Sequence, residues 1–456
     1  MPDEFAASRR SLIAAAFGVG AAAAMTTAAA AASKEILPNP PIDFPQDLIP
    51  NSEADQSAAL QAAIDRAAET DAPLTLAPGS YRVSDIRLRA GTRLIGPART
   101  ATLVFAGGAA FVTADKADGL VLRGIVFDGQ WKAFEDGRGE GLVSISRSEG
   151  VVIDDVEIRH SAQIGLSLIA CSGRIANTLI TGVLGAGVKA LDSAGLDIRN
   201  NVVTACGDNG VLVWRSEKGE DATTIVGNRI SHIRNASGGS GEYGNGINVF
   251  RAGSVMVANN RVSDCAYTAI RGNAADNIQI VANSCERLGE VAIYAEFGFE
   301  GALIANNVVD GAATGISVTN FNEGGRLAVI QGNLIRNLFR REREAVDKRG
   351  EGIGVEADAV VSGNTIEGAP TVGIQIGWGP YMRDVAVTGN VVRRSKVGVA
   401  VTADAAGGAC LVANNVISSA EDGAIRQMRL GAVFGPDLAR EPAALHGLTI
   451  SGNVAV

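Results

Sequence analysis

The sequence is poor in aromatic residues, histidine and cysteine, and each shortage narrows the range of possible proteins. Aromatic residues make up 5% of the 456 residues, so the core must consist mainly of aliphatic side chains. The three histidines are scattered along the chain, which argues against a zinc site built on histidine. Five cysteines are too few for a disulfide-dense scaffold, and because their number is odd, at least one is unpaired within the chain.

Basic charge and long apolar runs are also scarce. The 40 Lys and Arg residues face 49 Asp and Glu residues, which gives a net charge of −9. Sequence-independent nucleic-acid binding needs a basic surface, so we do not expect nucleic acid as a partner. No segment reaches the roughly 18 consecutive apolar residues that a membrane-spanning helix needs. We therefore expect no transmembrane segment in the mature chain.

Glycine is abundant, with 56 residues, and much of it belongs to a repeat that runs through most of the chain. A Gly-Asn or Asn-Asn pair followed by aliphatic residues recurs, as in Gly227-Asn228-Arg229-Ile230 and Asn306-Asn307-Val308-Val309. With the second residue of each pair as an anchor, thirteen equivalent positions between 125 and 453 are spaced by about 27 residues. The positions three before and two after each anchor are almost all aliphatic.

Each repeat is therefore predicted to form three short strands joined by Gly/Asn turns. One such coil cannot bury its own apolar face, so neighbouring coils must stack in parallel, about 4.8 Å apart. The predicted fold is all-β, a single-stranded parallel β-helix of about 13 or more coils, right-handed by the usual crossover rule. No Leu-x-x-Leu-x-Leu phrase recurs, which argues against a leucine-rich-repeat solenoid. The anchor asparagine is expected to adopt the left-handed turn and to hydrogen-bond along the stack.

The N-terminal part predicts export and a cap. Arg9 and Arg10 precede a mild apolar stretch and an alanine-rich run, which indicates a twin-arginine (Tat) signal over residues 1–32. The Tat translocase is then the export partner, and the mature protein is expected to be periplasmic or secreted. Residues 33–50 form a Pro-rich linker, and residues 51–456 the β-helix domain, with a capping helix (51–70), first coils (74–115) and repeats (118–456). The helix is expected to cover the open end of the first coil with one apolar face, formed by Leu60, Ala63, Ile64 and Ala67.

Two phrases after this helix carry a family resemblance. They are Leu74-Thr75-Leu76-Ala77-Pro78-Gly79-Ser80-Tyr81 and Gly91-Thr92-Arg93-Leu94-Ile95-Gly96. This opening resembles the N-terminal part of pectate-lyase-like right-handed parallel β-helix proteins. Together with the twin-arginine pair and the Asn/Gly repeats, the chain resembles the twin-arginine-translocated β-helix repeat family. The resemblance implies the fold and the export route, and it leaves the reaction and any cofactor unknown.

Four of the cysteines fall in the same pattern as the aliphatic residues. Cys206 and Cys265 both lie five residues after an anchor, and Cys285 and Cys410 lie in other core columns. We therefore expect them to pack in the core rather than to form disulfides or ligate a metal, and we predict no metal site.

The candidate catalytic residues project outward from the Gly-Ile-x-Val strand. Arg271 and Tyr294 are expected to be vertical neighbours, with Asn273 and Glu296 in the adjacent column. An exposed cation, phenol and carboxylate could bind and deprotonate an acidic sugar, so Arg271, Tyr294 and Glu296 are the catalytic candidates. Hydrolysis would need a second carboxylate flanking the same bond, and Glu356 lies further along the stack. The alternative is a solvated strand face with a chance ion pair.

Three long repeats carry extra residues at one corner, just before the Gly-Ile strand. The added segments are 129–136, 237–246 and 340–349, and we expect them to wall a groove. The further candidates for substrate binding are Lys189, Trp214, Tyr243, Asn248, Asn273 and Trp378.

The sequence thus favours an exported β-helix protein that binds or processes acidic polysaccharide, in the manner of a lyase or epimerase. Whether it is an enzyme at all, and whether it could be a glycoside hydrolase instead, stays open. One alternative is a non-catalytic periplasmic or cell-surface protein that binds glycan through the same groove. Another is a cofactor-carrying Tat substrate of unknown activity.

Overall fold

The computed structural model describes residues 44–135, 140–341, 350–441, 445 and 447–456. The predicted signal over residues 1–32, with Arg9 and Arg10, and most of the predicted linker lie outside the described residues. Among the residues that are described, no helix is both long enough and apolar enough to span a membrane.

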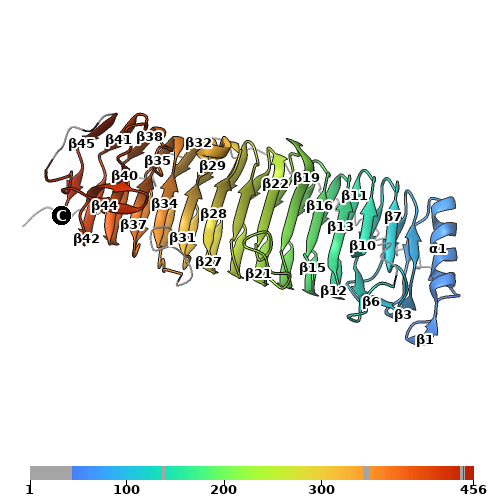
Figure 1. Cartoon of the computed structure of the whole chain (residues 1–456). Coiled ribbons are helices and arrows are strands. Elements are labelled where there is room, and N and C mark those ends of the chain that lie inside the picture. The colour runs from blue at the N-terminus through green and yellow to red at the C-terminus, as the bar shows by residue number, and fades with distance from the viewer. Residues whose placement is uncertain (1–43, 136–139, 342–349, 442–444, 446) are drawn as a thin grey trace, which may run out of the picture. The chain divides into compact units, whose positions relative to one another are not determined.

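Three sheets run along the described chain, and consecutive strands belong to different sheets, except that β43 (Ile425–Arg429) and β44 (Ala432–Phe434) are both in sheet 2. Sheet 1 has 16 strands, from β1 (Ser52–Asp55) to β46 (Val454–Ala455). Sheet 2 has 15, from β4 (Ile86–Leu88) to β44 (Ala432–Phe434), and sheet 3 has 15, from β2 (Leu74–Thr75) to β45 (Leu448–Ser451). The strands pair in parallel except for β44, which closes sheet 2 antiparallel to β43 (Ile425–Arg429). The predicted single-stranded parallel β-helix is therefore confirmed, and Figure 1 shows its coils stacked in sequence order.

The interior consists of stacked aliphatic columns. In sheet 3, Ile198, Ile225, Val257 and Ile280 follow one another in register on successive strands, and each is fully buried. Equivalent side chains therefore touch along the stack, which removes each coil's apolar face from water. The narrow interior explains why the chain contains so few aromatic residues.

All five cysteines are buried in this interior, and none forms a disulfide. The expectation that Cys206, Cys265, Cys285 and Cys410 are core residues is confirmed. Burial raises the pKa of the Cys206, Cys285 and Cys410 thiols to about 12, so these side chains stay neutral at physiological pH.

A column of asparagines runs along the inside of one turn. Its members are Asn201, Asn228, Asn260, Asn283, Asn307, Asn333, Asn364, Asn390, Asn415 and Asn453.

Each asparagine in this column bonds to the next one. The backbone N–H and Nδ2 of Asn283 donate to Oδ1 of Asn307, at 2.9 and 3.0 Å. Nδ2 of Asn307 in turn donates to the carbonyl of Ile280, at 2.9 Å. The expected bonding along the stack is confirmed, whereas the expected left-handed turn at the anchor is wrong. The left-handed φ falls one residue earlier, at Asn306 (57°) and Gly332 (65°), because the chain turns before the anchor side chain points inward.

The helix α1 (Ser57–Glu69) lies at the N-terminal end of the stack (Figure 1). It buries Leu60, Ala63, Ile64 and Ala67, the face that the sequence predicts. The side chain of Gln61 accepts a hydrogen bond from the N–H of Arg87 at 2.8 Å and donates to its carbonyl at 3.0 Å. These bonds give the outer edge of β4 hydrogen-bond partners. Sheet 2 therefore ends without an exposed strand edge that could pair with another chain.

The three insertions emerge at one corner, as expected. Each links a strand of sheet 1 to the next strand of sheet 2. The pairs of strands are β9 (Ile125–Asp128) and β10 (Gly141–Ser146), β21 (Arg229–Ile233) and β22 (Ile247–Gly253), and β33 (Leu334–Arg336) and β34 (Glu351–Val355). Residues 136–139 and 342–349 of these insertions lie outside the described part of the chain.

Replacement of Asn307 by alanine tests the asparagine column. The change leaves the buried N–H groups of Asn283 and the carbonyl of Ile280 without partners, so we expect the stability to fall by at least about 1–3 kcal/mol. Urea denaturation followed by circular dichroism should show a lower midpoint. Asn322→Ala, at an exposed position, is the matched control and should change stability by less than about 0.5 kcal/mol. Equal midpoints for the two variants would refute a stabilising role for the column.

Candidate functional site

The outer face of sheet 2 carries most of the candidate residues. Arg271 on β25 (Ile270–Asn273) stands directly opposite Tyr294 on β28 (Val291–Glu296). Asn273 stands opposite Glu296 one column further along. The pairing places these four side chains as the repeat spacing predicts.

Arg271 is engaged by its surroundings rather than open to solvent. Its Nε donates to Oε1 of Glu296 at 2.5 Å, and its guanidinium also donates to the carbonyl of Gly241. Nδ2 of Asn273 donates to the same glutamate oxygen at 3.2 Å, and the guanidinium carbon lies 5.3 Å from the centre of the Tyr294 ring. The side chains of Arg271 and Glu296 are only 14% and 7% exposed. The expected exposed patch is therefore a covered ion pair, because the 237–246 insertion folds over it.

The same insertion is held in place by a set of hydrogen bonds. The carboxylate of Asp208 accepts from the N–H and Oγ of Ser237, both at 2.8 Å. Nδ2 of Asn245 donates to the carbonyl of Gly241 at 2.9 Å, the carbonyl that Arg271 also binds. Arg271 thus has a structural role in addition to any chemical one.

The carboxyl group of Glu296 has a raised pKa. Burial disfavours its charged form, and this effect outweighs the attraction of Arg271. Glu290, which is also buried, adds like charge nearby and raises the pKa further. A carboxyl group with a raised pKa beside a cavity is a candidate for proton transfer.

A cavity of about 300 Å³ opens beside this ion pair, and we call it the aromatic cavity. The side chains that line it are Trp214, Ser240, Glu242, Asn248, Phe250, Arg271, Asn273 and Phe297. The rings of Trp214 and Phe250 lie 6.1 Å apart at an angle of 68°. The volume is at the lower end of the range typical of ligand sites.

Two polar atoms of the cavity wall have no hydrogen-bond partner among the described residues. They are Oδ1 of Asn248 and Nε1 of Trp214, and both are buried. Asn248 is 4% exposed as a whole. Buried polar groups in native proteins are nearly always paired, so these two atoms are an unusual feature of side chains that line a cavity.

The structure brings together some of the predicted residues and separates others. Trp214, Asn248, Arg271 and Asn273 line the aromatic cavity, and Tyr294 and Glu296 contact Arg271. These are the residues that share a small region of sheet 2.

The other candidates lie elsewhere or do not line this cavity. Lys189 is three strands away from Arg271 in sheet 2, and its Nζ binds Oε2 of Glu140 at 2.8 Å. Trp378 pairs with Tyr381 through a backbone bridge near the C-terminal coils. Tyr243 belongs to the covering insertion but is not among the lining residues.

Sequence reasoning missed Phe297 and Glu290. Phe297 follows the last residue of β28 with a left-handed φ of 56°, which the repeat pattern does not indicate. Glu290 lies just before the same strand, at the corner between sheets 1 and 2. At a corner, the repeat pattern does not predict whether a side chain points inward or outward.

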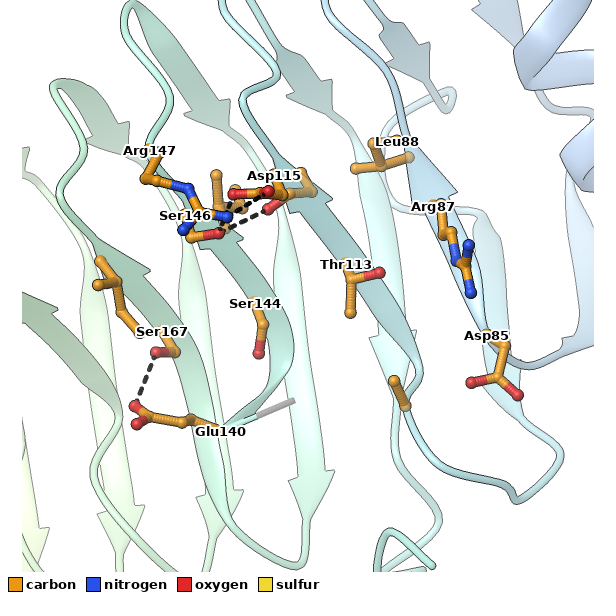
Figure 2. Close-up of a pocket in the computed structure, with 14 residues that line it drawn as sticks. Asp85, Arg87, Leu88, Thr113, Asp115, Glu140, Ser144, Ser146, Arg147 and Ser167 are labelled. Carbon is orange, nitrogen blue, oxygen red and sulfur yellow. Dashed lines mark hydrogen bonds and ion pairs between the residues drawn. The ribbon is translucent and has the colours of Figure 1, made fainter. Parts of the chain in front are cut away.

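A second hollow, of about 500 Å³, lies at the N-terminal end of the same face, and we call it the polar hollow. It spans β4, β7 (Val112–Asp115), β10 and β13 (Ile164–Ile169), as Figure 2 shows. Asp115 and Arg147 form an ion pair at its rim, and Oγ of Ser146 donates to Asp115 at 2.7 Å. The sequence analysis did not predict this hollow.

No group of three or more His, Cys, Asp or Glu side chains in the described ranges is arranged to hold a metal ion.

Comparison with a family model identifies the class of protein. Residues 140–323 and 209–392 both match the model of the right-handed beta helix region. Together the two overlapping matches cover more than half of the 456 residues, so the chain belongs to this family. The match also confirms the predicted right-handed sense of the coils.

Several solved structures are similar to this chain at low identity. The pre-mature bacteriophage phi29 gene product 12 has a TM-score of 0.52 and 15% identity, over 90% of this chain and 56% of that one. A GH87 α-1,3-glucanase from Streptomyces thermodiastaticus has a TM-score of 0.47 and 15% identity, over 90% and 67%. PfbA, a surface adhesin of Streptococcus pneumoniae, has a TM-score of 0.44 and 14% identity, over 85% and 92%. No curated protein matches the sequence.

The raised pKa of Glu296 predicts a pH dependence of stability. The folded protein keeps this proton to higher pH than the unfolded chain, whose carboxyl group has a pKa near 4.5. The contribution of Glu296 to stability is therefore fully present below pH 4.5 and declines as the pH rises through the folded-state pKa.

Glu296→Gln removes the titrating group and should flatten this part of the stability profile, measured as the urea midpoint at a series of pH values. Glu149→Gln is the matched control for loss of one exposed carboxylate. A Glu296→Gln profile parallel to that of the wild type across the acidic and neutral range would contradict the assignment.

Proposed function

We propose that this protein binds a polysaccharide on the outer face of sheet 2, with one sugar ring seated in the aromatic cavity. The observation that carries the proposal is the lining of the aromatic cavity, in which the Trp214 and Phe250 rings stand beside the amide side chains of Asn248 and Asn273. A sugar ring offers an apolar face for aromatic side chains and hydroxyl groups for polar ones. It therefore matches both properties of this cavity.

The proposed export through Arg9 and Arg10 fits this function, because the polysaccharides of the cell envelope and of the cell's surroundings lie outside the cytoplasm. We propose the periplasm or the cell exterior as the place of action. The net charge of −9 has no bearing on the binding of uncharged sugar surfaces.

For a bound uronate, the arrangement supports lyase-like or epimerase-like chemistry. Both reactions begin with removal of the proton on the carbon next to the carboxylate, which needs a base. Tyr294 would supply that base, and the guanidinium of Arg271 over its ring would stabilise the phenolate. Glu296, with its raised pKa, would balance the charge of Arg271 and exchange a proton during the cycle.

One observation favours the non-catalytic alternative instead. The positive charge of Arg271 is already compensated by Glu296 at 2.5 Å, so it is a weak counter-charge for a substrate carboxylate. A protein that only binds glycan would need no more than the aromatic cavity.

Binding is tested by Trp214→Ala. Loss of a central aromatic contact commonly costs about 2 kcal/mol, so we expect the Kd for bound oligosaccharides to rise about thirtyfold. The ligand comes from a glycan array, and calorimetry measures the Kd. Phe434→Ala, at a 39% exposed position on β44 at the C-terminal end of sheet 2, is the matched control and should leave the Kd unchanged. Equal Kd values for the two variants would remove the aromatic cavity from the proposal.

Catalysis is tested by Tyr294→Phe on alginate, pectate and related polymers. We expect the wild type to form unsaturated or epimerised products, and the variant to lose at least a hundredfold in rate while its Kd stays within about twofold. Absorbance of unsaturated uronates, reducing ends and NMR of the polymer detect the products. Unchanged turnover in the variant would refute the role of Tyr294. Binding without any product over days would leave the non-catalytic alternative.

A further inference from the structure

We propose that the polar hollow is a second subsite for the same polysaccharide chain and that it takes a sugar bearing a carboxylate. This inference rests on the proposed function. It assigns recognition of acidic groups to a place several coils away from Arg271.

The floor of the polar hollow is a row of polar side chains in register. Arg87 stands opposite Thr113, Thr113 opposite Ser144, and Ser144 opposite Ser167, on four successive strands of sheet 2. Figure 2 shows this row from Arg87 to Ser167, with Glu140 beside Ser167. Ser167 is only 1% exposed, so Arg87 and the hydroxyl groups of Thr113 and Ser144 form the surface that suits a hydroxylated ligand with an anionic group.

The other cations around this hollow are already paired, whereas Arg87 is not. Arg147 binds Asp115, and Lys189 binds Glu140 at 2.8 Å. Within the described residues, the exposed guanidinium of Arg87 makes no ion pair or side-chain hydrogen bond. It is therefore the group that can form a charge-assisted bond with a carboxylate.

Asp85 also lines the hollow, two residues before Arg87 on the chain. Its carboxylate is an acceptor for sugar hydroxyl groups. Asp85 repels any anion, but the hydroxyl groups of a sugar can donate to it and offset that repulsion, which a simple anion cannot do.

The two hollows lie on one continuous column of sheet 2. Ser144, Ser167, Lys189, Leu212 and Asn248 stand opposite one another in turn. The row from Arg87 to Ser144 continues this column, so six strand steps separate Arg87 from Asn248, or about 29 Å at about 4.8 Å per step. A polysaccharide chain that is seated in the aromatic cavity and is long enough to reach the polar hollow binds the second subsite intramolecularly. This raises the overall affinity without any change in the contacts at the aromatic cavity.

The experiment compares oligouronates of increasing length with carboxyl-reduced oligomers of the same length, by calorimetry. We expect the affinity of the wild type for oligouronates to rise steeply once the ligand is long enough to span about 29 Å, the distance from Asn248 to Arg87. Arg87→Ala should lower the affinity for long oligouronates by at least tenfold and leave the affinity for short oligomers unchanged. The carboxyl-reduced oligomers should show no effect of Arg87→Ala.

Two further variants keep the outcomes separate. Arg174→Ala removes an exposed arginine on sheet 3, at β14 (Gly173–Ala176), and should leave every affinity unchanged. Trp214→Ala should lower the affinity for short and long oligomers alike. If Arg87→Ala binds long oligouronates as the wild type does, while Trp214→Ala weakens them, the second subsite is refuted and the proposed function stands. If the wild type binds no oligosaccharide of any length, the proposed function fails, and this inference fails with it.

Discussion

The hydrogen bonds between stacked asparagines keep the coils in register, and the rest of the structure depends on that register. Each asparagine holds the next through its backbone and side-chain amides, as Asn283 does with Asn307. Sliding one coil against its neighbour would break these buried bonds and would also shift the aliphatic columns out of contact. The column therefore favours one alignment among the many that a repetitive sequence allows.

A fixed register is also what makes a site possible on a repetitive surface. Residues that are far apart in the chain, such as Arg271 and Glu296, become neighbours on adjacent strands. The corner insertion then converts a flat strand face into a cavity, because Asn245 and Arg271 both hold the carbonyl of Gly241 over it. The ion pair has two roles as a result. It supports the wall of the aromatic cavity, and it places a carboxyl group of raised pKa beside Tyr294.

The face of sheet 2 thus combines two kinds of surface. The aromatic cavity offers rings and amide groups, and the polar hollow offers hydroxyl groups and Arg87, which has no ion-pair partner among the described residues. A long polymer is the type of ligand that can use both, since the β-helix presents them in one line. In the proposed binding mode, Arg87 would be the counter-charge for a sugar carboxylate, a role that Arg271, already bound to Glu296, is less able to perform.

The spacing of aliphatic, glycine and asparagine residues was enough to predict the β-helix, its capping helix, the inward columns and the pairing of Arg271 with Tyr294. All of these follow from a period along the chain. The repeat says nothing about how far an insertion folds back, so the burial of Glu296 and the place of Phe297 were decided by tertiary structure. The repeat pattern did not predict the polar hollow for the same reason. Its residues look ordinary in sequence, and only the stacking of four strands brings Arg87, Ser144 and Ser167 together.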